Sequence, residues 1–312
     1  MKVLITGGAG FTGSRVVPLL LQAGHDVRCF VRPTTKLDRL PVDDVELALG
    51  EFEDPESFAR ALSGMDVLLN VASLGFGHGP DLVEAIENSE LNRVVFVSTT
   101  AIFTKLNAPS KTVRTVAENA IRESRLDYTI IRPTMIYGGP DDRNMCRLIN
   151  FLNRWLVIPV FGSGKCLQQP IHVEDVAAAV VGAAFEDKCI RQEYNLSGAA
   201  ALSYNEVIKT ISRGLGKKRF PLYLPASLVT AGLSLAEKLK INLPVKAEQV
   251  QRLNENKDFS HSEAARDFGF SARTFEEGIF AEIEQMGLLP PTIDTALHRG
   301  NFTDDDKTAN QN

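Results

Sequence analysis

Residues Val3 to Gly13 read VLITGGAGFTG, a short apolar run that leads directly into glycines at positions 7, 10 and 13. A helical pattern follows the third of these glycines. Glycine permits a sharp turn and lets the backbone approach a pyrophosphate, while the N-terminus of the helix offers free N–H groups. This spacing at a strand-to-helix junction is typical of a dinucleotide site. The sequence therefore predicts that a cofactor binds at Gly7, Gly10, Phe11, Thr12 and Gly13.

The residues about 20 positions further along indicate which dinucleotide is bound, because an NAD enzyme places a carboxylate there to bind the ribose 2′-hydroxyl. This chain has Arg32 instead, with Arg28, Lys36 and Arg39 around it. A guanidinium can form a charge-assisted fork with a 2′-phosphate and can stack on adenine. Arg32 and Lys36 therefore favour NADP(H) over NAD(H). Two alternatives stay open: the cations form only a solvated strand end, or Asp38 moderates the preference.

Short apolar runs alternate with amphipathic stretches through the first half of the chain, which is the pattern of a parallel sheet covered by helices on both faces. The predicted fold class is α/β, a doubly wound parallel sheet with a smaller, mainly helical C-terminal substrate lobe. Strands are expected at Lys2–Thr6, Asp26–Val31, Asp66–Val71, Arg93–Ser98 and Tyr128–Arg132, and helices at Ser14–Ala23, Pro55–Leu62, Leu82–Asn88 and Val113–Ser124.

Three regions follow from this pattern. Residues 1–200 are expected to form the cofactor-binding domain, within which the segments of 133–200 return and contribute to the substrate site. Helical patterns dominate 201–289, which we interpret as the helical lobe. Residues 290–312 are polar and lack an apolar period, which predicts a flexible tail.

The composition of the chain limits which classes of partner it can bind. A net charge of −5 and a pI near 5.7 provide no general field for nucleic acid, so a small-molecule substrate is expected. The four cysteines are widely separated and lack metal-ligand spacing, which indicates structural thiols, no metal and a reducing, cytoplasmic location. No apolar run is long enough for a signal peptide or a membrane span. The oligomeric state, monomer or homodimer, stays open.

Several further motifs carry a resemblance to a known superfamily. NVAS (70–73), VVFVSTTAIF (94–103), IIRPTMIYGGP (130–140) and IHVEDVA (171–177) follow the glycine turn in that order, and DFGFSARTFEEGI (267–279) comes near the end. Together they make residues 1–289 resemble the extended or atypical short-chain dehydrogenase/reductases, in the NAD-dependent epimerase/dehydratase-like branch.

The resemblance implies further cofactor contacts. Glu51 and Phe52 would lie at the adenine, and Asn70, Val71 and Ala72 beside the ribose and pyrophosphate. The segment Ser98 to Thr100 would face the nicotinamide, with Pro133 on its far side. Alternatively, the hydroxyls of that segment only cap the end of the strand.

The same superfamily uses a Tyr and a Lys four residues later for proton transfer, and this chain has Ser110 and Arg114 at those positions. Arg cannot donate a proton at ordinary pH, and Ser is a poor acid without a neighbouring base. Substitutes are conceivable: Thr99 or Thr100 could polarise a carbonyl, Lys111 or Lys105 could be the general acid, or Tyr137 could reach the substrate. Against these readings, the lysines could lie on a solvated loop and Tyr137 could pack in a core.

The substrate positions differ as well. Epimerases that act on nucleotide sugars place an Asn and an Arg where this chain has Met135 and Gln168, and Gln supplies neither the charge nor the fork that suits a pyrophosphate. His172 is expected to be a buried residue at a strand-to-helix corner, and Asp175 to cap the following helix.

Two functions follow. The first is an NADP(H)-dependent oxidoreductase that acts on a carbonyl or sugar-like small molecule with non-standard catalytic residues. The alternative is a non-catalytic NADP(H)-binding sensor or assembly factor, which the missing Tyr and Lys favour.

Overall fold

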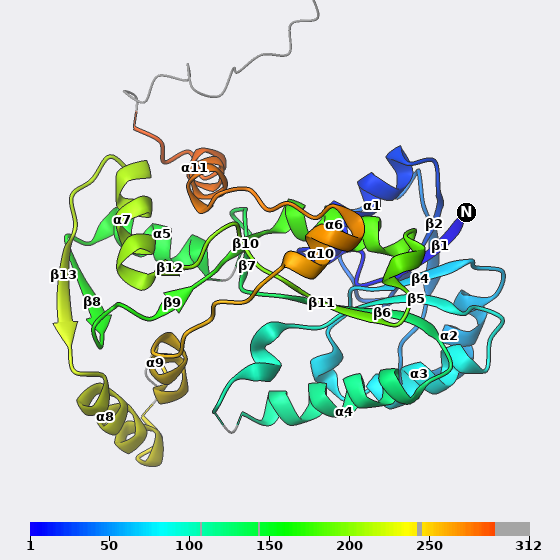
Figure 1. Cartoon of the computed structure of the whole chain (residues 1–312), viewed down its shortest axis with the longest axis horizontal. Coiled ribbons are helices and arrows are strands. Elements are labelled where there is room, and N and C mark those ends of the chain that lie inside the picture. The colour runs from blue at the N-terminus through cyan, green and yellow to red at the C-terminus, as the bar shows by residue number, and fades with distance from the viewer. Residues whose placement is uncertain (107, 143, 242–244, 291–312) are drawn as a thin grey trace, which may run out of the picture.

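The computed structural model describes residues 1–106, 108–142, 144–241 and 245–290. A seven-stranded sheet with strand order β11-β6-β5-β4-β1-β2-β3 forms its centre, and every neighbouring pair of these strands is parallel (Figure 1). The strands are β1 (Lys2–Thr6), β2 (Asp26–Val31), β3 (Glu46–Leu49), β4 (Val67–Asn70), β5 (Arg93–Val97), β6 (Asp127–Pro133) and β11 (Gln192–Leu196). The predicted α/β, doubly wound sheet is confirmed.

Helices cover both faces of this sheet. Successive strand side chains point to opposite faces, so Val3 and Ile5 face one core and Leu4 faces another. The first core lies under α1 (Gly13–Gln22), α6 (Val173–Ala184) and α10 (Ser262–Phe268). The second lies under α2 (Pro55–Leu62), α3 (Gly79–Glu87) and α4 (Pro109–Glu123), below the sheet in Figure 1.

A third core belongs to the smaller lobe. It packs α5 (Met145–Arg154), α7 (Tyr204–Gly214) and α11 (Phe275–Gln285) together with β8 (Val157–Phe161). The lobe also contains β13 (Phe220–Leu224), α8 (Ala226–Lys238) and α9 (Ala247–Leu253). Because this core combines residues before and after position 200, the domain boundary near 200 stays a prediction. The expected tail lies almost entirely outside the described residues, which end at Pro290.

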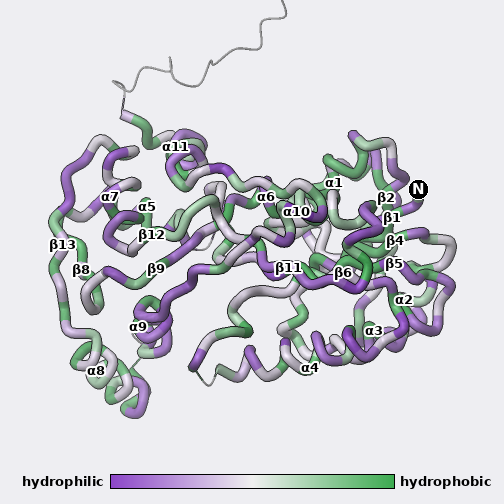
Figure 2. The backbone as a smooth tube through the Cα atoms, in the orientation of Figure 1, coloured by the Kyte–Doolittle hydropathy of each residue, from purple (hydrophilic) through white to green (hydrophobic). Residues whose placement is uncertain are grey.

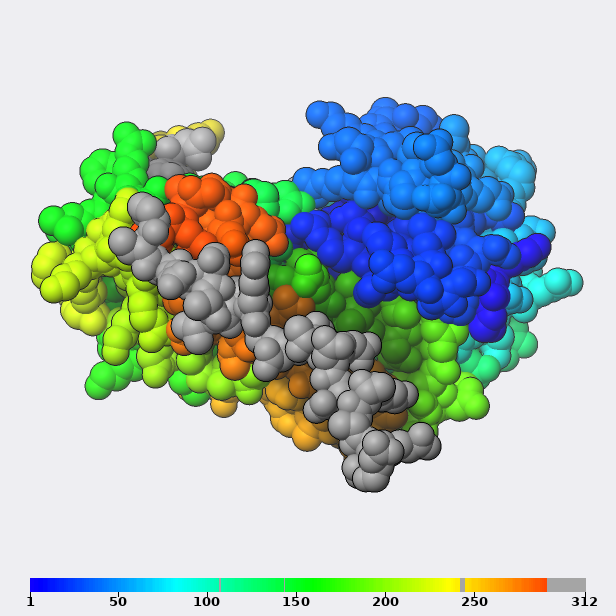
Figure 3. Space-filling view, turned by 90° about the horizontal axis from the view of Figure 1, so that it is seen from above, coloured from blue at the N-terminus to red at the C-terminus, as the bar shows by residue number. Residues whose placement is uncertain are grey.

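The remaining described elements are short. They are η1 (Leu74–Phe76), η2 (Thr100–Phe103), η3 (Asp187–Cys189), β7 (Ile136–Tyr137), β9 (Leu167–Gln168), β10 (Ile171–His172) and β12 (Leu202–Ser203). Strand β7 pairs with β10, and β9 pairs with β12. Figure 3 shows the lobes side by side, with α11 (orange) beside the N-terminal part of the chain (blue).

Two local expectations need correction. Strand β3 was not among the expected strands, because it is an edge strand of four exposed or partly exposed residues and lacks an apolar run. The N-cap of α6 is His172, whose Nδ1 accepts a hydrogen bond from the amide of Glu174, and not Asp175. Asp175 instead binds Arg273, which precedes α11.

None of the described helices is long and apolar enough to span a bilayer. The described part of the chain also holds no group of three or more His, Cys, Asp or Glu side chains that could bind a metal ion. All four cysteines are free.

Candidate functional site

The glycine turn lies between β1 and α1 and is tightly packed from behind. Gly7 has φ +73°, and a Cβ on it would lie 2.7 Å from the backbone nitrogen of Ala72. A Cβ on Gly13 would lie 2.2 Å from the carbonyl oxygen of Gly7. A Cβ on Gly10 would meet only the Gly7 oxygen, at 3.0 Å, so Gly10 faces open space. The turn is thus a cradle in which only glycine lets a ligand reach the backbone.

The end of β4 is fixed against this turn. Asn70 is buried beside Thr6, whose hydroxyl donates to the Asn70 side-chain oxygen at 2.7 Å. The Asn70 amide group in turn donates to the carbonyl of Ala72 at 3.2 Å. The predicted residues Asn70, Val71 and Ala72 therefore lie directly beside Gly7. This is the point where the strand order reverses between β1 and β4, and open α/β sheets bind ligands at such a point.

Arg32 and Lys36 follow β2 with exposed side chains, and neither has a partner within the described ranges. Arg28 points elsewhere: its guanidinium donates to the carbonyls of Ala61 and Ser63 and pairs with Glu46. Arg39 is also engaged, at 2.7 Å from a carboxylate oxygen of Asp141. Of the four cations around this strand end, Arg32 and Lys36 are the two left available for an anionic ligand.

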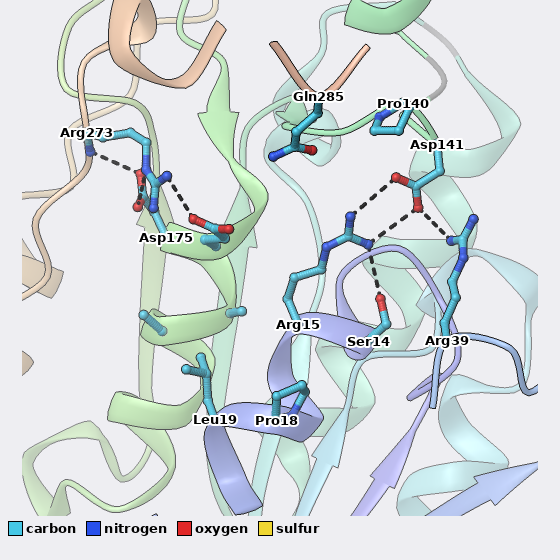
Figure 4. Close-up of a pocket in the computed structure, with 13 residues that line it drawn as sticks. Ser14, Arg15, Pro18, Leu19, Arg39, Pro140, Asp141, Asp175, Arg273 and Gln285 are labelled. Atoms are coloured by element: carbon cyan, nitrogen blue, oxygen red, sulfur yellow. Dashed lines mark hydrogen bonds and ion pairs between the residues drawn. The ribbon is translucent and has the colours of Figure 1, made fainter. Parts of the chain in front are cut away.

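A pocket of about 900 Å³ lies next to the turn, between α1, α6 and the end of α11 (Figure 4). Asp141 is central to it, because its carboxylate binds both Arg15 at 3.3 Å and Arg39 at 2.7 Å. On the other side, Arg273 pairs with Asp175 at 2.9 Å. No motif in the sequence indicated this group of ion pairs, since its members are far apart along the chain.

Phe52, which is predicted to lie at the adenine, belongs to a group of aromatic side chains. Its ring stacks on His78 with centroids 4.4 Å apart and also contacts Phe30 and Phe58. Burial lowers the pKa of His78. Glu51 is exposed and its backbone is held by the Ser57 hydroxyl. Both predicted adenine residues therefore lie at one edge of the sheet, with Phe52 already held by its neighbours.

The predicted nicotinamide residues lie at the ends of β5 and β6. The Ser98 hydroxyl donates to the carboxylate of Glu118 at 2.6 Å. The Thr100 hydroxyl donates to the carbonyl of Pro133 at 3.4 Å and is buried. Thr99 differs, because its hydroxyl oxygen accepts from the amide of Ala101 and no acceptor for its proton is found among the described residues. The hydroxyl protons of Ser98 and Thr100 are thus used in hydrogen bonds within the protein, and that of Thr99 is left for a ligand.

Helix α4 carries the positions where the superfamily has its Tyr and Lys. Arg114 lies against the loop after β4, since a Cβ on Gly75 would lie 2.7 Å from its guanidinium. It also donates to the carbonyl of Ser110 at 3.1 Å. Burial lowers the pKa of Arg114, and Arg252 acts in the same direction. Lys111, one residue after Ser110, donates to the carbonyl of Thr104 at 2.6 Å.

Tyr137 lies in the third core, apart from these residues. It is 1% exposed, its hydroxyl donates to the carbonyl of Phe275 at 3.5 Å, and its ring packs edge-on against His172. Burial raises the pKa of Tyr137, and burial lowers the pKa of His172 to about 4. The packing interpretation of Tyr137 therefore fits its environment better than a role in proton transfer, and His172 is buried at the corner as expected.

A family model described as NAD(P)H-binding matches residues 7–187, which is more than half of the chain. The chain belongs to this NAD(P)H-binding family. The match begins at Gly7 and includes the whole cradle, whose crowded glycines and exposed strand-end cations fit a dinucleotide. NAD(P)H binding by the domain is thus supported both by the family and by the shape of the turn.

Curated relatives of this NAD(P)H-binding chain include two kinds of protein. The Photosystem II assembly factor Ycf39 of Synechocystis sp. is 23% identical over 227 residues, which cover 69% of this chain and 68% of the relative. The NAD(P)H azoreductase of Xenophilus azovorans is 27% identical over 226 residues, covering 69% and 74%.

Among solved structures, the UDP-glucose 4-epimerase of Thermotoga maritima, determined with UDP-glucose, has a TM-score of 0.71. It is 19% identical to this chain, and the alignment covers 92% of this chain and 99% of the epimerase. This similarity shows that the chain shares the overall fold of that epimerase.

Proposed function

We propose that this protein is an NADP(H)-dependent oxidoreductase that reduces or oxidises a carbonyl or sugar-like small molecule. The observation that supports it most is the combination of the glycine cradle with the exposed, unpartnered Arg32 at the end of β2, as far as the described residues extend. Arg32 and Lys36 would bind the 2′-phosphate, which an NAD-selective carboxylate would repel. When bound, the nicotinamide supplies the hydride chemistry.

The residues that act on the substrate are proposed from their free hydrogen-bonding capacity. Thr99 would donate its hydroxyl proton in a hydrogen bond to the carbonyl oxygen, since its oxygen already accepts from Ala101. Lys111 would supply the proton that this oxygen takes up, because only one of its three N–H donors is bonded within the described residues, to the carbonyl of Thr104. Both residues come from neighbouring segments, because η2 packs against α4. Arg114 would position the cofactor from the place of the family's Lys.

A steady-state assay tests this proposal. Purified protein is given NADPH with a panel of aldehydes, quinones and 4-keto sugars, and the loss of NADPH absorbance is followed. We expect turnover with at least one class, and a fall in kcat of about 100-fold for Lys111→Met, as for the loss of a general acid. Lys188→Met in η3, at the other end of the sheet, is the matched control and should leave kcat unchanged.

A second candidate function is supported by a specific observation, the Ser110 and Arg114 pair in place of Tyr and Lys. It is a non-catalytic NADP(H)-binding regulatory or assembly protein, in line with the Ycf39 relative, which is a Photosystem II assembly factor. Tight NADPH binding without turnover across the panel would favour it over the oxidoreductase. Free thiols at all four cysteines support a cytoplasmic location for either function.

A further inference from the structure

Helix α8 is apolar on two faces but packs mainly against one neighbour, α9. Its outward residues are Leu228, Ala231, Gly232 and Leu235, followed by Leu239, which repeat at helical spacing. Leu228 is 70% exposed, Leu235 59% and Leu239 63%. No residue of α8 is buried. A helix that is apolar around most of its surface normally lies inside a protein or against a membrane, so this face lacks the cover that its sequence requires.

The ribbon of β8 and β13 continues this apolar surface along the chain. Parallel pairing places Val157 beside Phe220 and Pro159 beside Leu222, on the face opposite the buried Ile158 and Val160. Val157, Phe220 and Leu222 are exposed, as are Trp155 and Leu156 just before β8. In Figure 1 the ribbon and α8 lie together at the end of the molecule away from the large sheet, and in Figure 2 most of this segment is green or white.

Basic residues flank both parts of this surface. Residues 217–246 contain six Lys and Arg (Lys217, Lys218, Arg219, Lys238, Lys240 and Lys246) and one acidic residue, Glu237. The segment therefore carries a charge of about +5 in a chain whose net charge is −5. None of these six cations has a carboxylate partner among the ion pairs of the described residues. Lys217 and Arg219 donate to backbone carbonyls of Leu152 and Asn153, so their charges are not neutralised. Apolar side chains bordered by cations without carboxylate partners are typical of a helix that lies in the surface of an anionic bilayer.

We propose that α8 and the β8–β13 ribbon form a docking surface for an anionic phospholipid bilayer. The leucines of α8 and the aromatic residues Trp155 and Phe220 insert at the level of the headgroups, while the flanking lysines contact the lipid phosphates. A second copy of the chain fits this surface less well. A two-fold interface would place the basic segment against itself, and like charges at an interface oppose association.

Vesicle binding tests the proposal with the full chain. Protein is sedimented with vesicles of phosphatidylcholine alone, and with vesicles of phosphatidylcholine and phosphatidylglycerol in equal amounts. We expect binding to the anionic vesicles, weakened by added salt. Trp155 is the only tryptophan of the chain, so its fluorescence should shift to shorter wavelength on docking.

Three double variants separate the contributions of the apolar and the basic residues to vesicle binding. Leu228→Ser with Leu235→Ser should lower the partition coefficient by about tenfold or more, because both side chains are exposed and would enter the bilayer. The matched control, Val42→Ser with Val116→Ser, removes two exposed apolar residues outside the surface and should bind as the parent does. Lys218→Gln with Lys240→Gln should weaken binding to anionic vesicles only. This second variant still tests the docking surface if the leucine variant fails to fold.

Three results would overturn the proposal. The first is the absence of binding to anionic vesicles, and the second is binding to both vesicle types that no variant changes. The third is a dimer in solution, seen by light scattering, that the leucine variant converts to a monomer, since this would show a second copy on the surface.

Discussion

The Ser98 hydroxyl and the Glu118 carboxylate, 2.6 Å apart, join the end of β5 to the middle of α4. Glu118 is 1% exposed and also pairs with Arg132 of β6 and Arg122 of α4. Glu193 of β11 completes the network by binding the same two arginines. Burial opposes ionisation of Glu193, but the hydrogen bonds from Arg122 and Arg132 outweigh it and lower its pKa to about 2. Four elements at the predicted nicotinamide site are thus held by one network.

Removing the charge of Glu118 should therefore destabilise the fold. Glu118→Gln leaves the buried Arg132 with a single carboxylate partner, and we expect a loss of about 3 kcal/mol in the free energy of unfolding. Denaturant titration measures it. Glu123→Gln, on the exposed end of the same helix, is the control and should change stability by less than about 0.5 kcal/mol. Equal effects of the two substitutions would mean that the network contributes nothing.

A side chain at Gly10 should remove cofactor binding without unfolding the protein. Gly10→Val places its methyl groups on the open side of the turn, where only the Gly7 oxygen is near, so the pyrophosphate is displaced while the packing behind the turn survives. Calorimetry should detect no heat with NADPH, and the melting temperature should stay close to that of the parent. Gly232→Ala in α8 is the control: an added Cβ there has no neighbouring atom within 4 Å, and this variant should bind NADPH as the parent does. Retained affinity in Gly10→Val would place the cofactor elsewhere.

Arg32 should determine the preference between the two cofactors. Arg32→Ala removes a charge-assisted contact with the 2′-phosphate, and we expect NADPH binding to weaken by about 1.5–3 kcal/mol while NADH binding is unchanged. Fluorescence titration with each reduced cofactor gives both constants. Arg60→Ala, an exposed arginine of α2, serves as the control. If the parent binds NADH more tightly than NADPH, the proposed preference is wrong.

Glu282 should make stability fall as pH rises. The side chain is 0% exposed in α11, and burial, reinforced by Asp142, raises its pKa from 4.5 to about 8. The amides of Gly138 and Gly139 partly oppose this rise, although neither carboxylate oxygen makes a hydrogen bond of good geometry within the described residues. Between pH 4.5 and about 8 the folded state binds a proton that the unfolded state has lost. Stability therefore decreases with pH across this window.

Glu282→Gln removes that titration. We expect the variant to gain stability relative to the parent as pH rises through this window, on the order of a few kcal/mol by pH 8. Thermal unfolding at a series of pH values measures the difference. Glu276→Gln, an exposed carboxylate of the same helix, should follow the parent. Parallel stability curves for Glu282→Gln and the parent would contradict the assignment.

The sequence predicted the features that depend on local chemistry. The glycine turn requires three residues without Cβ atoms at fixed spacing. The sequences of β1, β4 and β5 are continuous apolar runs because these strands are buried on both faces of the sheet. The helical pattern of residues 201–289 also predicted helices in the region that contains α8. A periodic pattern does not tell whether another part of the protein covers such a helix. The edge strand β3 was missed because exposure removes the apolar signal.

The sequence could not indicate contacts between distant segments. Arg28 and Arg39 are close to Arg32 along the chain, yet the structure turns one toward Ala61 and pairs the other with Asp141. Nor could the sequence show that the hydroxyls of Ser98 and Thr100 donate hydrogen bonds to Glu118 and Pro133. Such choices depend on which acceptor the fold brings near, so the catalytic assignments stay predictions.

Asp141 joins segments of the molecule that are far apart along the chain. It belongs to the segment that leads into α5 of the smaller lobe, while Arg15 and Arg39 belong to the helix and the loop beside the cofactor turn. A motion that moved these segments apart would break two partly exposed ion pairs. Because salt screens such pairs, the rate of opening, and with it the release of a bound nucleotide, should rise with ionic strength.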